Sequence, residues 1–151
     1  MAVQRNEPYG AFNFLVVCDR FGDPAGINAG FQEVSGLGME VSVSEYRSGN
    51  EKTNDVRKVP GLSRASDVTL KRGVIGATDL FEWIKQVRDG GGNIRSNVVI
   101  QLLDESRQVV MTWKLHNAFP FRYNLSPLIA ADSTDVAVEE LVLTCDRIDV
   151  E

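Results

Sequence analysis

The chain is poor in the residues on which most enzyme chemistry depends. Its 151 residues include one histidine, His116, and two cysteines, Cys18 and Cys145. A serine or cysteine nucleophile needs a base within reach, which one histidine hardly supplies, and the two cysteines do not have zinc-ligand spacing. Both cysteines lie in apolar, strand-like runs, so we expect buried, reduced thiols. The sequence therefore predicts a protein that is not an enzyme and has no cofactor or metal.

Long apolar runs and an excess of positive charge are also missing. FLVVC, residues 14–18, is among the longest apolar runs, too short to span a bilayer, and the first ten residues lack a signal-peptide stretch. We therefore expect that the chain is made and first assembled in the cytoplasm, with no direct membrane insertion. The net charge of −5 argues against a nucleic-acid binder of the basic-patch kind. The length and the 43% apolar content predict one domain over residues 1–151.

Alternation of apolar and polar residues predicts a mainly β protein. In MEVSVSEY, residues 39–46, the side chains of Met39, Val41 and Val43 share one face, and the polar set on the other face is Glu40, Ser42, Ser44 and Tyr46. A strand with one wet face is typical of an antiparallel sheet that is covered on one side. Further strands are expected over residues 12–18, 31–35, 68–71, 96–104, 108–115 and 136–150. We predict an antiparallel β-sandwich or barrel with one helix packed at its side.

The one convincing helix covers residues 79–88. Its apolar stripe is widened by aromatic residues, and the side chains expected to anchor it to the β core are Leu80, Trp83, Ile84 and Val87. Asp79 with Glu82 fits a capping box, and three glycines from Gly90 follow the end of the helix.

Two glycine motifs suggest nucleotide binding, but neither fits. VTLKRGVIGATDLF, residues 68–81, has the order strand, glycine loop, helix, yet it lacks the spacing and the lysine of a Walker loop. Asp79 at the helix start would also repel an anion. Gly36-Leu37-Gly38 lacks the third glycine of a dinucleotide fingerprint. The adjacent acids Glu139 and Glu140 would point to opposite faces of a strand, so they cannot share a substrate.

Residues 47–61 form a polar, aperiodic stretch that contains Gly49, Pro60 and Gly61. We predict a long loop, and loops of this length are more often functional than filler. The segment from Arg47 to Arg72 carries seven basic residues against three acidic ones, and the last twenty residues carry seven acidic residues against Arg147. Either these segments contact each other between copies of the chain, or they form a solvated loop beside a solvated terminus.

Several motifs in one order resemble a known family. They are EVSGLG followed by EYRSGN, PG before VTLKRG, then LFEWI, TWKLHNAFP and DVAVEELVLTCDRI. Together they resemble the tail tube proteins of contractile phages, closest to the inner-tube proteins of extracellular contractile injection systems. The resemblance covers nearly the whole chain.

The resemblance implies a structural subunit that forms hexameric rings, which stack into a tube inside a contractile sheath. Strands of each subunit would join a ring-wide β-barrel with Glu40, Ser42 and Ser44 facing the lumen. The long loop would reach neighbouring subunits through Arg47, Asn50, Lys52, Arg57 and Lys58. The implied partners are other copies of the chain, the sheath protein, baseplate and tube-capping proteins, and cargo protein or phage DNA in the lumen.

The resemblance also implies a location in a phage tail or in a tail-like particle that is released from the cell. Two related functions stay open, a tube-initiating ring of the baseplate and a secreted ring carrier of the type VI secretion kind. The first would be recognised by single rings instead of long tubes.

Overall fold

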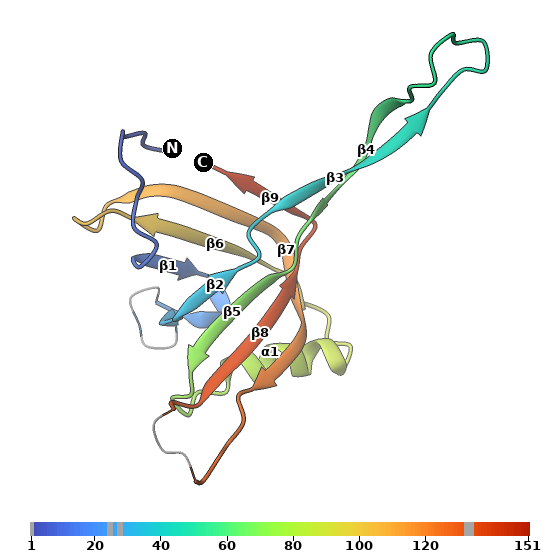
Figure 1. Cartoon of the computed structure of the whole chain (residues 1–151). Coiled ribbons are helices and arrows are strands. Elements are labelled where there is room, and N and C mark those ends of the chain that lie inside the picture. Colours follow the sequence, from blue (N-terminus) through green and yellow to red (C-terminus); the bar gives the residue numbers. More distant parts are fainter. Residues whose placement is uncertain (1, 24–25, 27–28, 132–134) are drawn as a thin grey trace.

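A computed structural model describes residues 2–23, 26, 29–131 and 135–151 (Figure 1). The described part is antiparallel β structure with one α-helix, which confirms the predicted fold class. The elements are β1 (Phe14–Val17), the 3-10 helix η1 (Asp19–Phe21), β2 (Glu33–Ser35), β3 (Met39–Tyr46), β4 (Arg57–Ala65), β5 (Val68–Gly73), α1 (Asp79–Arg88), β6 (Ser96–Leu103), β7 (Val109–Leu125), β8 (Val138–Thr144) and β9 (Arg147–Val150). None of the described helices has the length and apolar character needed to cross a membrane.

The body of the protein consists of two sheet layers that share the long strand β7. The first half of β7 pairs with β6 and β9, and β6 also pairs with β1. From Phe119 onward β7 pairs with β8, which continues to β5 and β2. The register between β7 and β8 shifts between Pro120 and Arg122, and such a bulge bends a strand. One strand can therefore belong to both layers (Figure 1).

The core lies between the two layers, and the strands of the body supply it, with clear alternation in β5. In β5 the side chains of Val68 and Leu70 are fully buried, and in β8 so are those of Leu141 and Leu143. Helix α1 packs beside β7 and adds Leu80 and Trp83 to the same core. Burial of each large apolar side chain stabilises the fold by about 1.5–3 kcal/mol.

Trp83 joins the helix to two other parts of the body, the segment before β6 and the 3-10 helix η1. Its indole Nε1 donates a hydrogen bond of 2.7 Å to the carbonyl of Ile94, and its ring meets Phe21 edge-on with centroids 5.9 Å apart. The guanidinium of Arg20 lies 4.9 Å from the centre of the same ring. Of the other predicted anchor residues, Leu80 is buried, while Ile84 and Val87 are half-buried.

The structure corrects three predicted boundaries. The loop expected over residues 47–61 is shorter, because β4 begins at Arg57 and includes Pro60 and Gly61. Proline is tolerated there because β4 has a partner on one edge only, and the register shift opposite Val41 and Val43 absorbs the irregularity. The strand expected over residues 108–115 continues to residue 125. The run over residues 136–150 is divided into β8 and β9.

Candidate functional site

Strands β3 and β4 form an arm that projects from the body (Figure 1). Among the described strands, these two pair only with each other. Every residue of β3 is exposed, and so are eight of the nine residues of β4. An isolated two-stranded hairpin is marginally stable in water, so we expect that a contact with another molecule would stabilise the arm.

The arm has one apolar face and one polar face. Opposed residues of an antiparallel pair lie on the same face, so Val41 shares a face with Ser63, and Ser44 shares the other face with Val59. The apolar face carries Met39, Val41 and Val43, which are 59%, 47% and 61% exposed. The alternation predicts a sheet that is covered on this side, and within the subunit this part of the sheet is not covered. The reason is that the arm leaves the body immediately after β2.

Each face of the arm continues a face of the body. Ala65, which opposes Met39, packs against the core cluster, so the apolar face of the arm extends the core side of the sheet. Glu40 opposes Arg64 on the other side, where Ser42 and Ser44 follow. These three predicted lumen residues are all exposed.

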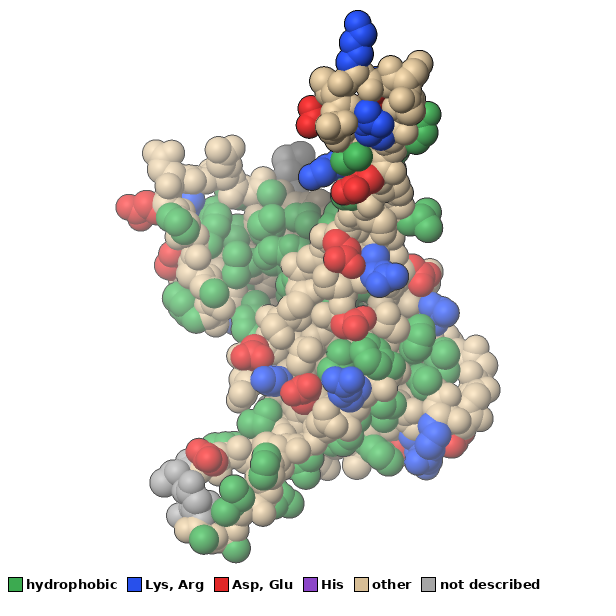
Figure 2. Space-filling model, turned by 45° about the vertical axis from the view of Figure 1, so that its right-hand side comes forward, with side chains coloured by type: hydrophobic (Ala, Val, Ile, Leu, Met, Phe, Trp, Pro, Cys, Tyr) green, Lys and Arg blue, Asp and Glu red, His purple; other side chains and the backbone are tan. Residues whose placement is uncertain are grey.

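The outer face of the second layer carries charges of both signs in register. Across the sheet, Glu33 of β2 opposes Lys71 of β5, Lys71 opposes Glu140 of β8, and Glu140 opposes Asn124 of β7. The Nζ atom of Lys71 lies 3.2 Å from a carboxylate oxygen of Glu33. Figure 2 shows acidic and basic side chains interspersed on the face below the arm. This face is therefore polar without a dominant sign of charge.

At the tip of the arm, residues 47–56 connect the two strands. The guanidinium of Arg47 closes the tip, because it donates hydrogen bonds of 2.8–3.0 Å to the backbone carbonyls of Glu51 and Thr53. Lys52 and Asn50 are exposed, while Arg57 and Lys58 lie at the start of β4. Residues 47–58 carry four basic and two acidic side chains. Basic side chains stand out at this end of the molecule (Figure 2).

A buried ionic cluster fixes the start of α1 to the sheet. Arg72 is 1% exposed and forms contacts of 2.6 Å with a carboxylate oxygen of Asp79 and with one of Glu139. The Tyr123 hydroxyl donates a 2.7 Å hydrogen bond to the second oxygen of Glu139. Burial, together with this hydrogen bond, raises the pKa of Tyr123 to about 12.

Sequence reasoning missed this cluster. Asp79 was assigned to a capping box, but its carboxylate binds Arg72, and the residue before the helix makes no side-chain cap either. The 67 residues that separate Arg72 from Glu139 leave no local signal. The opposite placement of the paired acids was predicted correctly, since Glu139 is buried and Glu140 is not.

Ion pairs within the subunit limit which charges remain for a contact between the basic segment of one copy and the acidic last segment of another. Several acids of the last segment already have partners within the subunit. The pairs are Arg72 with Glu139, Arg95 with Asp146, Lys114 with Glu151, and both His116 and Arg147 with Asp149. The arm tip is thus the part of the basic segment best placed to contact another copy.

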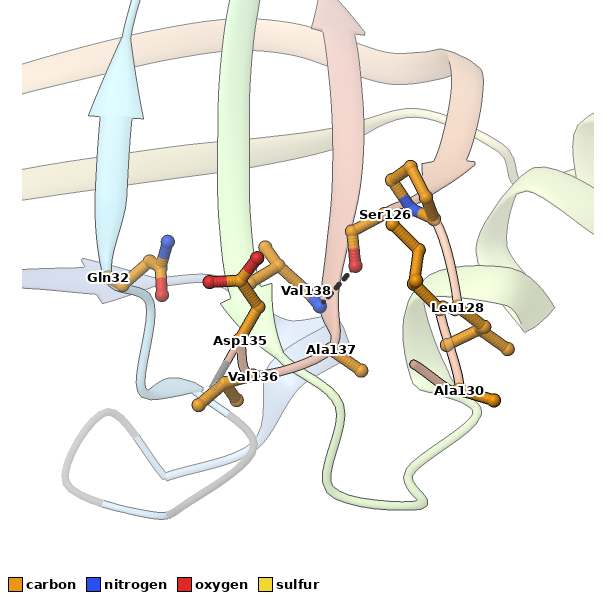
Figure 3. Close-up of a pocket in the computed structure, with 10 residues that line it drawn as sticks. Gln32, Ser126, Leu128, Ala130, Asp135, Val136, Ala137 and Val138 are labelled. Atoms are coloured by element: carbon orange, nitrogen blue, oxygen red, sulfur yellow. Dashed lines mark hydrogen bonds between the residues drawn. The ribbon is translucent and has the colours of Figure 1, made fainter. Parts of the chain in front are cut away.

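At the end of the body opposite the arm, the β7–β8 connection borders a pocket of about 780 Å³. Ser126 and Val138 close the base of this loop, because each backbone N–H donates to the other residue, to Val138 O and to Ser126 Oγ. Figure 3 shows Asp135 on the β2 side of the pocket and Leu128 on the β7 side. Leu128 is 76% exposed, so this pocket presents apolar surface to solvent. Within the described ranges, no group of His, Cys, Asp and Glu is arranged to hold a metal ion.

Comparisons with known proteins identify the family and the fold. The model of the T4-like virus tail tube protein gp19 family matches residues 10–149. A chain in the sheath–tube complex of the PVC extracellular contractile injection system, in its extended state, is 32% identical. The alignment covers 97% of this chain and 93% of that chain, with a TM-score of 0.80. A chain in the anti-feeding prophage baseplate is 29% identical over 97% of both chains, with a TM-score of 0.82.

Hcp1 from Flavobacterium johnsoniae shares the fold alone, with 13% identity, coverage of 91% and 93%, and a TM-score of 0.53. No curated protein sequence matches the chain significantly. The family model spans nearly the entire sequence, and the alignments with the two injection-system chains each cover 97% of it. The resemblance seen in the sequence motifs is confirmed, and the chain belongs to the T4-like virus tail tube protein gp19 family.

Proposed function

We propose that the chain forms hexameric rings that stack into the inner tube of a contractile injection system or phage tail. The observation that supports this proposal most strongly is the uncovered arm, an exposed hairpin joined to a sheet with two unpaired edges. Exposed sheet edges invite association, and natural proteins normally protect them. In the described residues, the outer edge of β2 and β3 has no partner strand, and neither has the edge of β7 beyond Ala118 on the side where β6 ends.

Strand directions favour a closed ring. The second layer is antiparallel throughout in the order β2, β5, β8 and β7, so its two edge strands run in opposite directions. A rotation about a ring axis keeps strand directions relative to that axis. The β2–β3 edge of one copy would therefore meet the β7 edge of the next copy in antiparallel orientation. Closure in this way would remove every edge of the barrel.

In such a ring the polar outer face of the sheet would line the lumen. It would present Glu40, Ser42 and Ser44 together with the charged row that contains Glu33, Lys71 and Glu140. A strongly basic lining would hold nucleic acid tightly by counterion release, whereas a conduit must let its contents slide. The mixed charges suit a passage for cargo protein or DNA.

Stacking of rings would use opposite ends of the subunit, because a head-to-tail contact is heterologous. The end of the arm, residues 47–58, carries two more basic than acidic side chains, and the pocket at the other end of the subunit contains Asp135 beside exposed apolar side chains. Such complementarity sets register and polarity more than affinity. We propose that the tube then contacts a sheath protein on its outside and baseplate and capping proteins at its ends.

Negative-stain electron microscopy and light scattering of the purified chain test this function. We expect rings with a central hole and stacks of them at high protein concentration. A stable monomer under all conditions, with or without baseplate proteins, would contradict the proposal. Single rings that never stack would instead favour a tube-initiating ring, which the similarity to a chain of a baseplate structure also supports.

A further inference from the structure

We propose that the groove between α1 and β7 is a socket for the apolar face of the arm of the adjacent copy. The inference rests on the proposed ring and adds the residues that join one subunit to the next. It accounts for two apolar surfaces that are uncovered in the single subunit, namely the groove between α1 and β7 and the apolar face of the arm.

The groove is lined mostly by apolar side chains and has a volume of about 620 Å³. Phe81 of α1 is 42% exposed and Phe121 of β7 is 43% exposed. The ring of Phe81 contacts Tyr123 edge-on, with centroids 5.9 Å apart, and Ile84 and Val87 complete the floor. Partly exposed aromatic side chains that share one groove are typical of a binding surface.

Sheet geometry places the groove and the arm on the same side of the proposed barrel. Tyr123 opposes Leu141, a core residue, so the groove lies on the core side of β7 at its unpaired edge. The apolar face of the arm also continues the core side, as the contacts of Ala65 show. If β3 of one copy pairs with β7 of the next, their core-side side chains become neighbours, since paired strands share their faces. Met39, Val41 and Val43 then lie against the groove.

The charges at the rim of the groove also complement a charge on the arm of the adjacent copy. Lys85, Arg88 and Arg122 border the groove. On the arm, Glu45 follows Val43 by two residues and therefore lies on the apolar face, closer to the tip. A carboxylate that passes a rim of three cations is attracted at short range and contributes to orientation.

Disulfide trapping tests the contact directly. Phe81→Cys would be combined in turn with Met39→Cys, Val41→Cys and Val43→Cys, in a background with Cys18→Ala and Cys145→Ala. A disulfide needs Cα atoms within about 7 Å, so at least one pair should give a ladder of cross-linked oligomers up to a closed ring under oxidising conditions. Val59→Cys with Phe81→Cys is the control, because Val59 lies on the other face of the arm.

A matched pair of charge substitutions gives a second test. Val41 and Val59 are both 47% exposed but lie on opposite faces of the arm. We expect Val41→Asp to weaken ring formation at least tenfold and Val59→Asp to leave it nearly unchanged, with the same melting temperature for both isolated subunits.

The outcomes separate this inference from the proposed function. Rings that form normally with Val41→Asp, or that give no ladder with any of the three pairs, overturn the socket and leave the ring intact. A background protein that forms no rings contradicts the proposed function itself. Protection of Phe81→Cys from a thiol reagent only after sheath protein is added would assign the groove to the sheath and also overturn the inference.

Discussion

Strands β5 and β3 carry the same alternation of apolar and polar residues, yet they have opposite surroundings. In β5 every second residue is buried, while in β3 none is. The apolar face of β5 is covered by the chain itself, and the apolar face of β3 is uncovered in the single subunit. A period of two thus shows that a face is meant to be covered, but it does not show what covers it. The body should therefore carry the stability of the subunit and the arm its assembly.

The largest effect on subunit stability is expected from Trp83→Ala in the body. Removal of a fully buried indole should lower the free energy of unfolding by about 3–5 kcal/mol. The midpoint of chemical denaturation measures it, and Val43→Ala in the arm is the control, with an expected change within about 0.5 kcal/mol. Equal losses for both variants would show that the arm is part of the cooperative core.

A smaller loss is expected from Tyr123→Phe, which removes the donor to buried Glu139. An acceptor left without its partner costs about 1–3 kcal/mol. Tyr46→Phe is the matched change in the arm, where the hydroxyl of Tyr46 pairs with Ser48 on an exposed surface. It should leave the melting temperature unchanged, and a comparable drop for Tyr46→Phe would contradict the division between body and arm.

Tyr123 also predicts a dependence on alkaline pH. Its pKa is raised from 10.0 to about 12 in the folded state, so folding favours the protonated hydroxyl. This contribution is complete below pH 10, the pKa of the unfolded chain, and is lost as the pH rises through about 12. The difference in melting temperature between wild type and Tyr123→Phe should be constant from pH 7 to 9 and should narrow above pH 10. A difference that stays constant up to pH 12 would remove Tyr123 from the cluster.

The smallest effect on subunit stability is expected from Arg57→Glu with Lys58→Glu on the arm. Both side chains are exposed, so the free energy of unfolding should change by no more than about 0.5 kcal/mol. Tube elongation, followed by light scattering, should nevertheless stop. Added salt should slow wild-type elongation, because exposed charges are screened within about 8–10 Å at moderate ionic strength. Normal growth of the reversed variant would show that apolar contacts alone drive stacking.

The sequence predicted an element best where its apolar pattern matches the surroundings of that element in the fold. Helix α1 follows its apolar stripe because two residues of the stripe, Leu80 and Trp83, pack in the core of the same chain. Pro60 and Gly61 were assigned to a loop, since both disfavour a central strand, but an arm with unpaired edges tolerates them. Pro120 hid the continuation of β7 in the same way, because the bulge beside it absorbs the irregularity.

The candidate interfaces were less accessible to sequence reasoning. The contact between Arg72 and Glu139 depends on the pairing of β5 with β8, which no local spacing encodes. The groove beside Phe81 could be suspected only from an aromatic residue at the margin of the helical stripe. A surface that binds another copy can be recognised by the exposed apolar side chains of one chain. The contacts themselves lie between chains, so the contacts within one chain do not show them.

The most direct test of the division between body and arm is a variant in which residues 42–62 are replaced by Asn-Gly. Val41 and Ser63 oppose each other, and a two-residue Asn-Gly turn connects such a pair well. Sedimentation velocity and thermal melting should show a folded monomer with nearly the wild-type melting temperature and no rings or tubes. Rings formed by this variant, or an unfolded chain, would contradict the account.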